Sequence, residues 1–394
     1  MSRRVRILAL LALLTGVVEP AALQAQMFFE ADAVLFNRRG GNTGGAYLLG
    51  PDAAVISAPG NSYEPGYRLV LGGVLDQWQV DAAFTQVSPW EGFASGGLTQ
   101  MVILDDTFGN PVVNPGGLAN RLAIPNALFD AAALQFDEQT ESERLQGGGN
   151  WTYYDRANYR DFEINLGSSR NMSPWRFSVG YRHIRYDGRN QFTVSGVFDA
   201  IDTADGAVFG DLTNQPNDSL AGTSLIAAGM IGFGQFDALA TGNGPDTLLY
   251  AHRSRADNEL NGAQTTFVWR MIDSPWVTIE GIGKAGLFHN NMQASLVETV
   301  WGTGNGDAQY TRSFNDRRTG AAFAGNVGMK AIFSLTDYMN LVGGYEFVFL
   351  AGLGTPGNQA YGLGTDTLGA RTFRAHNSSD LVIHGGTVGV EVNW

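Results

Sequence analysis

Apolar and polar residues alternate with a period of two in ten separate segments of the chain. The last segment shows the pattern clearly, since Val388, Val390, Val392 and Trp394 fall on alternate positions, separated by polar or small residues. A period of two places apolar side chains on one face of a β-strand and polar side chains on the other. The other nine segments are 27–36, 67–75, 78–87, 159–167, 175–187, 262–271, 276–288, 321–333 and 338–350. Each is about as long as a tilted strand that crosses a bilayer, so we predict ten membrane-spanning strands.

The connections between these segments alternate between short and long. The short connections lie near 76–77, 167–174, 273–275 and 334–337, and the long ones span about 37–65, 88–156, 188–259, 291–318 and 351–379. This alternation predicts an all-β, up-and-down antiparallel transmembrane β-barrel with short periplasmic turns and long outer loops. Segment 191–200 allows two interpretations: it extends the fifth strand, or it begins a further hairpin and gives twelve strands. The long loops could also fold inward and constrict the barrel.

The first 25 residues have the features of a secretory signal peptide. Three arginines (Arg3, Arg4, Arg6) precede the apolar run 7–18, and small residues lead up to Ala25. The apolar run is too short to cross a bilayer as a helix, and a cleavage site after Ala25 fits the pattern. We therefore expect residues 26–394 to form a single barrel domain in the outer membrane.

Composition narrows the classes of partner and chemistry. The formal net charge of −13 makes the whole chain a poor binder of nucleic acid or anionic lipid. The chain has no cysteine, which excludes disulfides and thiolate chemistry. None of the five histidines lies in an HExxH pair or beside a Gly-x-Ser-x-Gly turn, so we predict no enzyme, metal or cofactor. Two alternatives to this prediction are a hydrolase site at the outer rim and a Ca²⁺ site in the acidic segments 202–211 and 302–307.

Aromatic residues recur at the short-turn end of the predicted strands. Trp78, Trp175, Trp276, Tyr338 and Trp394 all occupy that position. Aromatic side chains at one boundary of an apolar band are typical of the girdle of a membrane barrel. The alternating valines that end in Trp394 resemble the C-terminal signal that barrel-assembly machinery recognises. We therefore expect outer-membrane lipid and that machinery as partners.

The polar face of the predicted strands carries both signs of charge and faces the lumen. These side chains are Glu30, Asp32, Arg68, Asp81, Asp161, Glu163, Arg176, Arg182, Arg270, Glu280, Lys284, Lys330, Glu346 and Glu391. Opposite charges on neighbouring strands, such as Glu163 with Arg176 or Arg182, could pair across the ladder. Two arrangements fit the pattern: a paired network that plugs a narrow barrel, or a lining that gives a narrow pore its charge preference.

Three stretches of the chain point to a family. The opening FFEADAVLFNRRGG, the central PWRFSVGYRHIRYDG and the final LVIHGGTVGVEVNW resemble the predicted beta-barrel porin family of planctomycetes. The resemblance implies an outer-membrane barrel and supplies no catalytic residues. The leading functional hypothesis is a porin-like passive channel for small solutes or ions. The alternative is a non-conducting structural or adhesive barrel that acts through long acidic surface loops.

Overall fold

The structure is a computed structural model. It describes residues 26–40, 43–49, 54–57, 62–104, 121–125, 144–169, 173–201, 246–303, 307–365 and 371–394. The predicted signal peptide and the acidic piece 202–211 lie outside these residues. Among the described residues, no helix combines the length and the apolar character that a membrane crossing requires.

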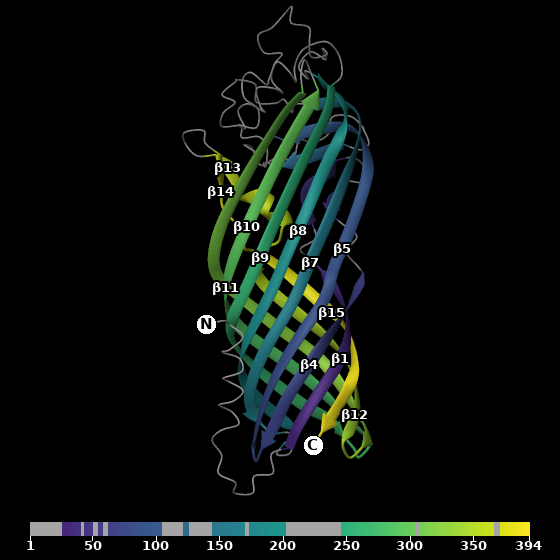
Figure 1. The fold of residues 1–394 in the computed structure, drawn as a ribbon, viewed down its shortest axis with the longest axis vertical. Helices are drawn as coiled ribbons and strands as arrows, with labels where there is room; N and C mark the ends of the chain where they lie inside the picture. Colours follow the sequence, from purple (N-terminus) through teal and green to yellow (C-terminus); the bar gives the residue numbers. More distant parts are fainter. Residues whose placement is uncertain are drawn as a thin grey trace, which may run out of the picture.

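Ten antiparallel strands close into a barrel (Figure 1). They are β1 (Gln26–Arg39), β4 (Tyr63–Leu75), β5 (Trp78–Leu104), β7 (Arg144–Ser168), β8 (Trp175–Ile201), β9 (Asp246–Asp273), β10 (Val277–Thr303), β11 (Asp307–Thr336), β12 (Met339–Leu353) and β15 (Ser379–Asn393). Each of the ten predicted segments lies within one of these strands or overlaps it almost completely. The prediction of ten strands is therefore confirmed. The twelve-stranded alternative is wrong, because 191–200 continues β8.

The barrel closes where the first strand meets the last. β15 pairs with β1 on one side and with β12 on the other. The ladder begins at the lower end, where the backbone N–H of Trp394 donates to the carbonyl of Met27 at 3.0 Å and the reverse bond is 2.9 Å. An open edge would leave a row of backbone groups without partners, which is costly in lipid. The alternating terminal segment is thus held along its whole length.

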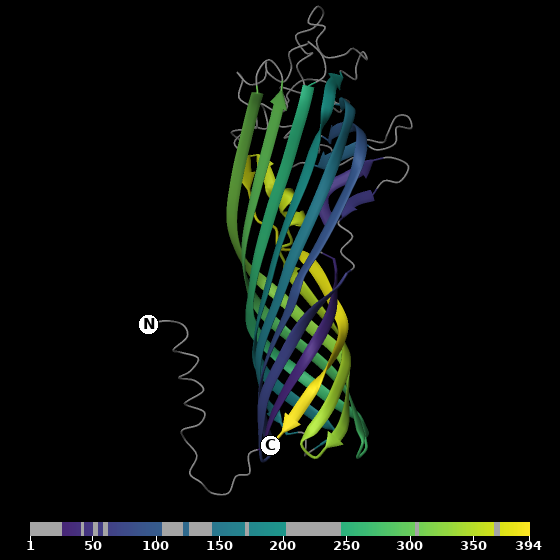
Figure 2. The same cartoon turned by 45° about the vertical axis from the view of Figure 1, so that its right-hand side comes forward.

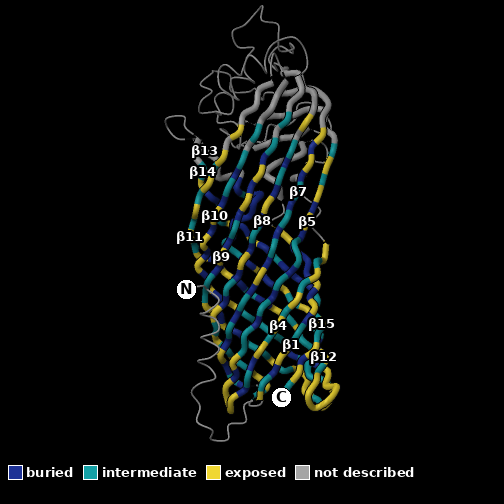
Figure 3. Tube along the Cα trace, in the orientation of Figure 1, coloured by how far each residue is buried: buried dark blue, intermediate teal, exposed yellow. Residues whose placement is uncertain are grey.

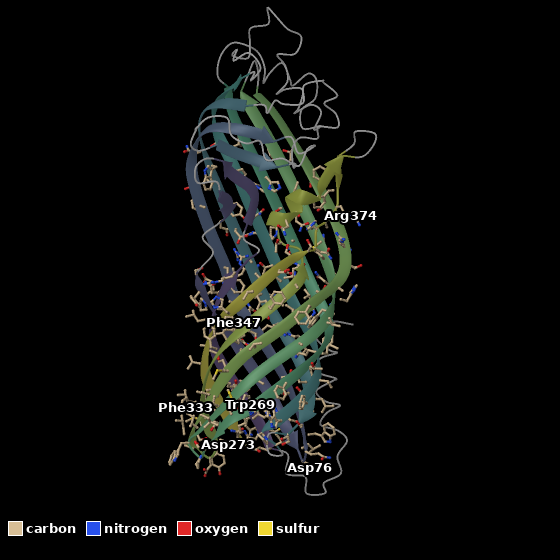
Figure 4. All side chains as sticks on the ribbon, turned by 180° about the vertical axis from the view of Figure 1, so that it is seen from behind. Asp76, Trp269, Asp273, Phe333, Phe347 and Arg374 are labelled. Carbon is tan, nitrogen blue, oxygen red and sulfur yellow. The ribbon has the colours of Figure 1, made fainter. Side chains whose placement is uncertain are left out.

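The outer surface of the lower barrel is apolar. Exposed residues alternate with buried or partly buried ones along most of the strands there (Figure 3). Most of the exposed positions are large apolar side chains, including Phe177, Val327 and Phe347. The girdle residues Trp78, Trp175, Trp276, Tyr338 and Trp394 are all exposed at the lower end, and Trp175 stacks on Trp269. In Figure 4, Trp269 and Phe333 lie near the lower turns, and Phe347 lies higher up the barrel.

The strands at the upper end are longer than the sequence pattern indicates. β10 extends to Thr303 and β11 begins at Asp307, so most of the predicted loop 291–318 is a continuous β-hairpin. The acidic piece 302–307 accordingly consists of two strand ends and three residues, 304–306, outside the described ones. The six long strands β5 and β7 to β11 rise as a curved wall above the four shorter ones (Figure 2). The hydrogen-bond ladder continues there, but polar side chains such as Asn291 and Gln293 take the outer face, so the apolar-outward pattern of the lower strands ends.

Short elements complete the upper end. β2 (Thr43–Leu49), β3 (Ala54–Ser57) and β6 (Arg121–Pro125) extend the sheet beside β5, and β6 pairs with it in parallel. The connection from β12 to β15 contains the 3₁₀ helix η2 (Gly357–Gly362) and the hairpin of β13 (Leu363–Thr365) and β14 (Arg371–Phe373). In both ribbon views this connection lies against the concave side of the wall (Figures 1 and 2).

The close approach of β1 and β15 gives a test of closure. A Cβ on Gly389 would collide with the carbonyl oxygen of Ala31 and with Oδ1 of Asp32, whereas a Cβ on Gly386 would meet only Gly344 at 3.7 Å. We expect Gly389→Ala to destabilise the barrel by about 1–3 kcal/mol, because the seam must separate to admit the methyl group. Gly386→Ala should leave stability nearly unchanged. Urea unfolding, followed by the loss of the folded form's electrophoretic mobility without heating, measures both. Equal stability of the two variants would contradict the tight seam.

Candidate functional site

Five ion pairs join inward-facing side chains. In four of them the two partners come from strands that are not neighbours, and in the fifth they lie diagonally across the ladder of two adjacent strands. Lys330 Nζ and Glu30 Oε2 are 2.5 Å apart, and Arg176 Nη2 and Glu280 Oε1 are 2.8 Å apart. The other three pairs are Arg68 with Glu346, Lys284 with Glu163, and Arg182 with Asp161. Two strands separate the partners in the Lys330, Arg68 and Lys284 pairs, so these contacts cross the interior rather than following the ladder. Ten of the fourteen predicted lumen charges are therefore brought together in pairs.

Arg182 is the centre of this network. Its guanidinium is about 1% exposed and donates to both oxygens of Asp161, with the shortest bond 2.6 Å long. It also donates to Oδ1 of Asn326 on β11 at 2.8 Å and to Oε1 of Gln264 on β9 at 3.4 Å. Gln264 in turn donates to Oε2 of Glu163 at 2.6 Å. A buried charge needs a full set of partners, and this fork-shaped cation supplies donors in several directions at once.

The remaining predicted lumen charges occupy separate places. Asp81 accepts from Asn165 at 3.0 Å, and Glu391 accepts from Asn340 at 3.0 Å. Asp32 is buried, and its Oδ1 has no hydrogen-bond partner within the described chain. Arg270 lies at the lower rim, where it pairs with the exposed Asp273 at 2.9 Å.

One predicted pairing is wrong. Glu163 does lie opposite Arg182 in the β7–β8 register, as the sequence indicated. Its ion pair is nevertheless with Lys284, while Arg182 pairs with Asp161 and Arg176 with Glu280. The barrel curvature brings side chains from across the interior within reach, and they compete with the direct cross-strand neighbour.

A layer of apolar side chains lies above the charged network. It consists of Val34, Phe36, Val87, Trp90, Ala157, Tyr159, Ile184, Tyr186, Leu260, Phe288, Ala322, Ala324, Val348, Leu350, Leu353, Leu381 and Ile383. These residues form one cluster, are at most 5% exposed, and come from nine of the ten barrel strands, all except β4. A side chain that faced an open lumen would be exposed to water, so these low values show that the side chains of the layer are packed closely against their neighbours.

A sixth interior ion pair lies above this layer, and the alternating pattern did not identify it. Arg38 pairs with Asp155 across the interior and donates to the hydroxyl of Tyr186 at 2.9 Å. Both charged groups are about 1% exposed. Asp155 belongs to a segment predicted as loop, so its inward orientation could not be assigned from alternation. The sequence does contain one indication of this pair. Arg38 and Arg39 are adjacent, so one of them must face inward if the first strand continues that far.

The connection between β12 and β15 folds into the upper barrel. Asn258 donates to the carbonyl of Gly354 at 2.7 Å and accepts from its N–H at the same distance. Ser254 donates to the carbonyl of Pro356 at 2.5 Å, and Arg318 donates to that of Ala375 at 3.1 Å. Thr355, Pro356 and Gln359 are buried there. Of the predicted long loops, this one does fold inward and fills space inside the wall.

The histidines do not assemble a catalytic site among the described residues. His252 was expected in a loop but lies on β9, facing inward, and its Nε2 has no hydrogen-bond partner there. His183 and His289 are on β8 and β10 with outward orientation, and His183 Nδ1 is 2.9 Å from Oδ1 of Asn261. His376 lies in the final connection, as expected, and His384 is in the upper part of β15. No group of three potential metal ligands occurs in the described ranges.

Comparison with known proteins gives only remote structural likenesses. No protein-family model and no curated protein matches the chain. The outer membrane protease OmpT from Escherichia coli is 9% identical, with 96% of this chain and 100% of that chain covered and a TM-score of 0.36. The Pseudomonas putida toluene transporter TodX is 10% identical, with 94% and 89% covered and a TM-score of 0.20. These TM-scores are too low to support an argument, so the barrel assignment rests on this chain's own strand pairing.

Removal of the central arginine tests the network. We expect Arg182→Met to lower the free energy of unfolding by about 3–5 kcal/mol, because Asp161 stays buried without its cation. The matched control is Arg185→Met on the same strand, whose side chain is exposed on the outer face and should cost at most about 1 kcal/mol. Equilibrium urea unfolding of both variants in the same vesicles provides the comparison. Similar small losses in both would show that Arg182 is not central.

Burial of His252 predicts an acid-dependent loss of stability. Burial lowers the pKa of His252 from 6.5 to about 4. The unfolded chain then binds more protons than the folded one between these values, so stability is lost as pH falls through that range. We expect the stability of the wild type relative to His252→Asn to fall by about 2–3 kcal/mol between about pH 7.5 and about pH 4.5. Urea unfolding at both pH values measures this difference. A constant difference would contradict the buried neutral histidine.

Proposed function

We propose that the chain is an outer-membrane β-barrel that spans the bilayer with its lower half and is closed to solutes. The apolar outer band with its aromatic lower rim supports the membrane placement, since an exposed apolar surface of this kind needs lipid. The closed hydrogen-bond ladder supports it as well, because no backbone edge faces lipid in the described part of the barrel.

The observation that carries the closed state is the apolar layer. Side chains from nine strands meet there and are at most 5% exposed. Paired charges fill the interior below the layer, and the β12–β15 connection fills it above. Three successive obstacles favour a structural or surface-acting barrel over the passive channel. The passive channel remains the second candidate, because charged side chains line much of the lower interior.

The wall of long strands is the part that such a barrel presents to the outside. It extends well above the apolar band on six strands, held by the full ladder rather than by loops (Figure 2). We infer that this wall carries the functional surface of the protein. The narrower resemblance to the planctomycete porin family and recognition of Val388, Val390, Val392 and Trp394 by assembly machinery remain predictions.

Ion flux distinguishes the closed barrel from a channel. We expect the refolded chain to give no stable conductance steps in a planar bilayer, because the apolar layer blocks the lumen. A variant that truncates the layer, Phe288→Ala with Leu260→Ala and Ile184→Ala, should show measurable leakage if it folds. Retained heat-resistant mobility provides the folding control. Stable, salt-dependent steps from the wild type would contradict the closed barrel and restore the channel.

A single charge in the apolar band tests the membrane placement. Val327 is 68% exposed on the outer face of β11, near the middle of the band. Val327→Arg should destabilise the barrel in vesicles by about 2–4 kcal/mol, the cost of an arginine facing the bilayer centre. Thr319→Arg, on the same face of the same strand but above the band, is the matched control and should cost little. Equal effects in urea unfolding from vesicles would contradict the placement.

A further inference from the structure

Six arginines gather on the outer face of three adjacent strands, directly above the apolar band. They are Arg156, Arg160, Arg185, Arg189, Arg253 and Arg255, and we call them the arginine patch. They alternate with buried residues on β7, β8 and β9, so they point away from the interior. The described outward positions above the band on these strands also carry three acids: Asp187, Asp257 and Glu259. The patch is therefore locally basic on a chain whose net charge is −13.

The strand register sets like charges against one another. Arg160 lies opposite Arg185, Arg156 opposite Arg189, and Arg189 opposite Arg255. Like charges directly opposite on one face of a sheet destabilise it. Ion pairs with Glu91, Asp187 and Asp257 compensate the positive charges of Arg156, Arg185 and Arg255, respectively. Arg160, Arg189 and Arg253 are exposed and form no ion pair within the described part of the chain. An anion bound at the patch would relieve the repulsion among them.

The height of the patch relative to the apolar band indicates the class of anion that it binds. Among the β8 residues whose exposure is described, the uppermost exposed apolar one is Tyr181, and Arg185 follows it by four positions on the same face. At about 3.3 Å per residue and a tilt of about 40°, Arg185 and its neighbour Arg160 lie about 10 Å above Tyr181. Arg156, Arg189 and Arg255 lie about 20 Å above it by the same measure. In the proposed membrane placement, the lower pair is at the level of lipid headgroups and the upper row is just outside them.

We propose that the arginine patch binds the phosphate groups of a phosphorylated glycolipid in the outer leaflet. Guanidinium groups form bidentate, charge-assisted hydrogen bonds with phosphate oxygens. Several arginines at two heights suit a lipid with more than one phosphate better than a lipid with a single one. The net negative charge of the chain argues against anionic-lipid binding in general, but the local surface reverses that expectation. The proposal rests on the membrane placement inferred above.

Titration of lipid A, a diphosphorylated glycolipid, tests the proposal. The refolded full chain in phosphatidylcholine vesicles is compared with Arg160→Gln/Arg189→Gln/Arg253→Gln, which removes no ion pair between described residues. We expect the triple variant to bind lipid A roughly tenfold more weakly or worse, since each removed charge lowers attraction to the anionic lipid. The control Arg39→Gln/Arg317→Gln/Arg374→Gln removes three exposed arginines outside the patch and should bind as the wild type does. High salt should weaken wild-type binding.

The outcomes distinguish a lipid ligand from a soluble anion. Equal lipid A affinity in the wild type and the patch variant would overturn the proposal. Binding of inorganic pyrophosphate as tight as that of lipid A would also overturn it, because the site would then take a soluble anion. Failure of every variant to insert into vesicles would contradict the membrane placement and this proposal with it. Insertion with equal affinities would contradict this proposal alone.

Discussion

The narrow interior of a ten-stranded barrel is the constraint on which the rest of the structure depends. Such a barrel is only slightly wider than those that side chains fill, so inward-facing residues contact one another across the axis. Any charge among them loses most of its water and must be paired. The crossing pairs Lys330–Glu30, Arg68–Glu346 and Lys284–Glu163 are the response of this chain to that requirement. They also fix the rotation of each strand relative to the strands on the far side.

The same constraint orders the barrel along its axis. The outer face is apolar below and charged above, and the interior is charged below and apolar in its middle layer. The charged interior therefore lies within the apolar band, where the outer face contributes no polar partner. Above the band, the strands continue and enclose the Arg38–Asp155 pair and the inserted connection. The inserted connection fills the space that the four short strands leave open.

Much of the fold follows from local pattern, and the contacts do not. Alternation in segments such as 175–187 predicts both the strand and the face of each residue, because a period of two is a local property. It cannot predict that Lys284 reaches Glu163, since that contact depends on the stagger of all the strands between them. It also misses Asp155 and the upper parts of β10 and β11. The outer face is polar there and buried apolar side chains such as Met292 and Leu296 face inward, which is the reverse of the pattern in the lower strands. The net charge of −13 gives no indication of the arginine patch, because the patch is formed by the register of β7, β8 and β9.

The packed apolar layer is the central claim, and the absence of cysteine from the chain allows a direct test. Ala324 lies within the layer with no exposed surface, and Thr319 is exposed on the outer face of the same strand. Ala324→Cys and Thr319→Cys can each be treated with a charged, water-soluble thiol reagent in the folded state. A closed interior predicts rapid labelling at position 319 and none at position 324 until the protein is unfolded. Labelling at similar rates at both positions would mean that water and ions reach the layer, and the barrel would then be open.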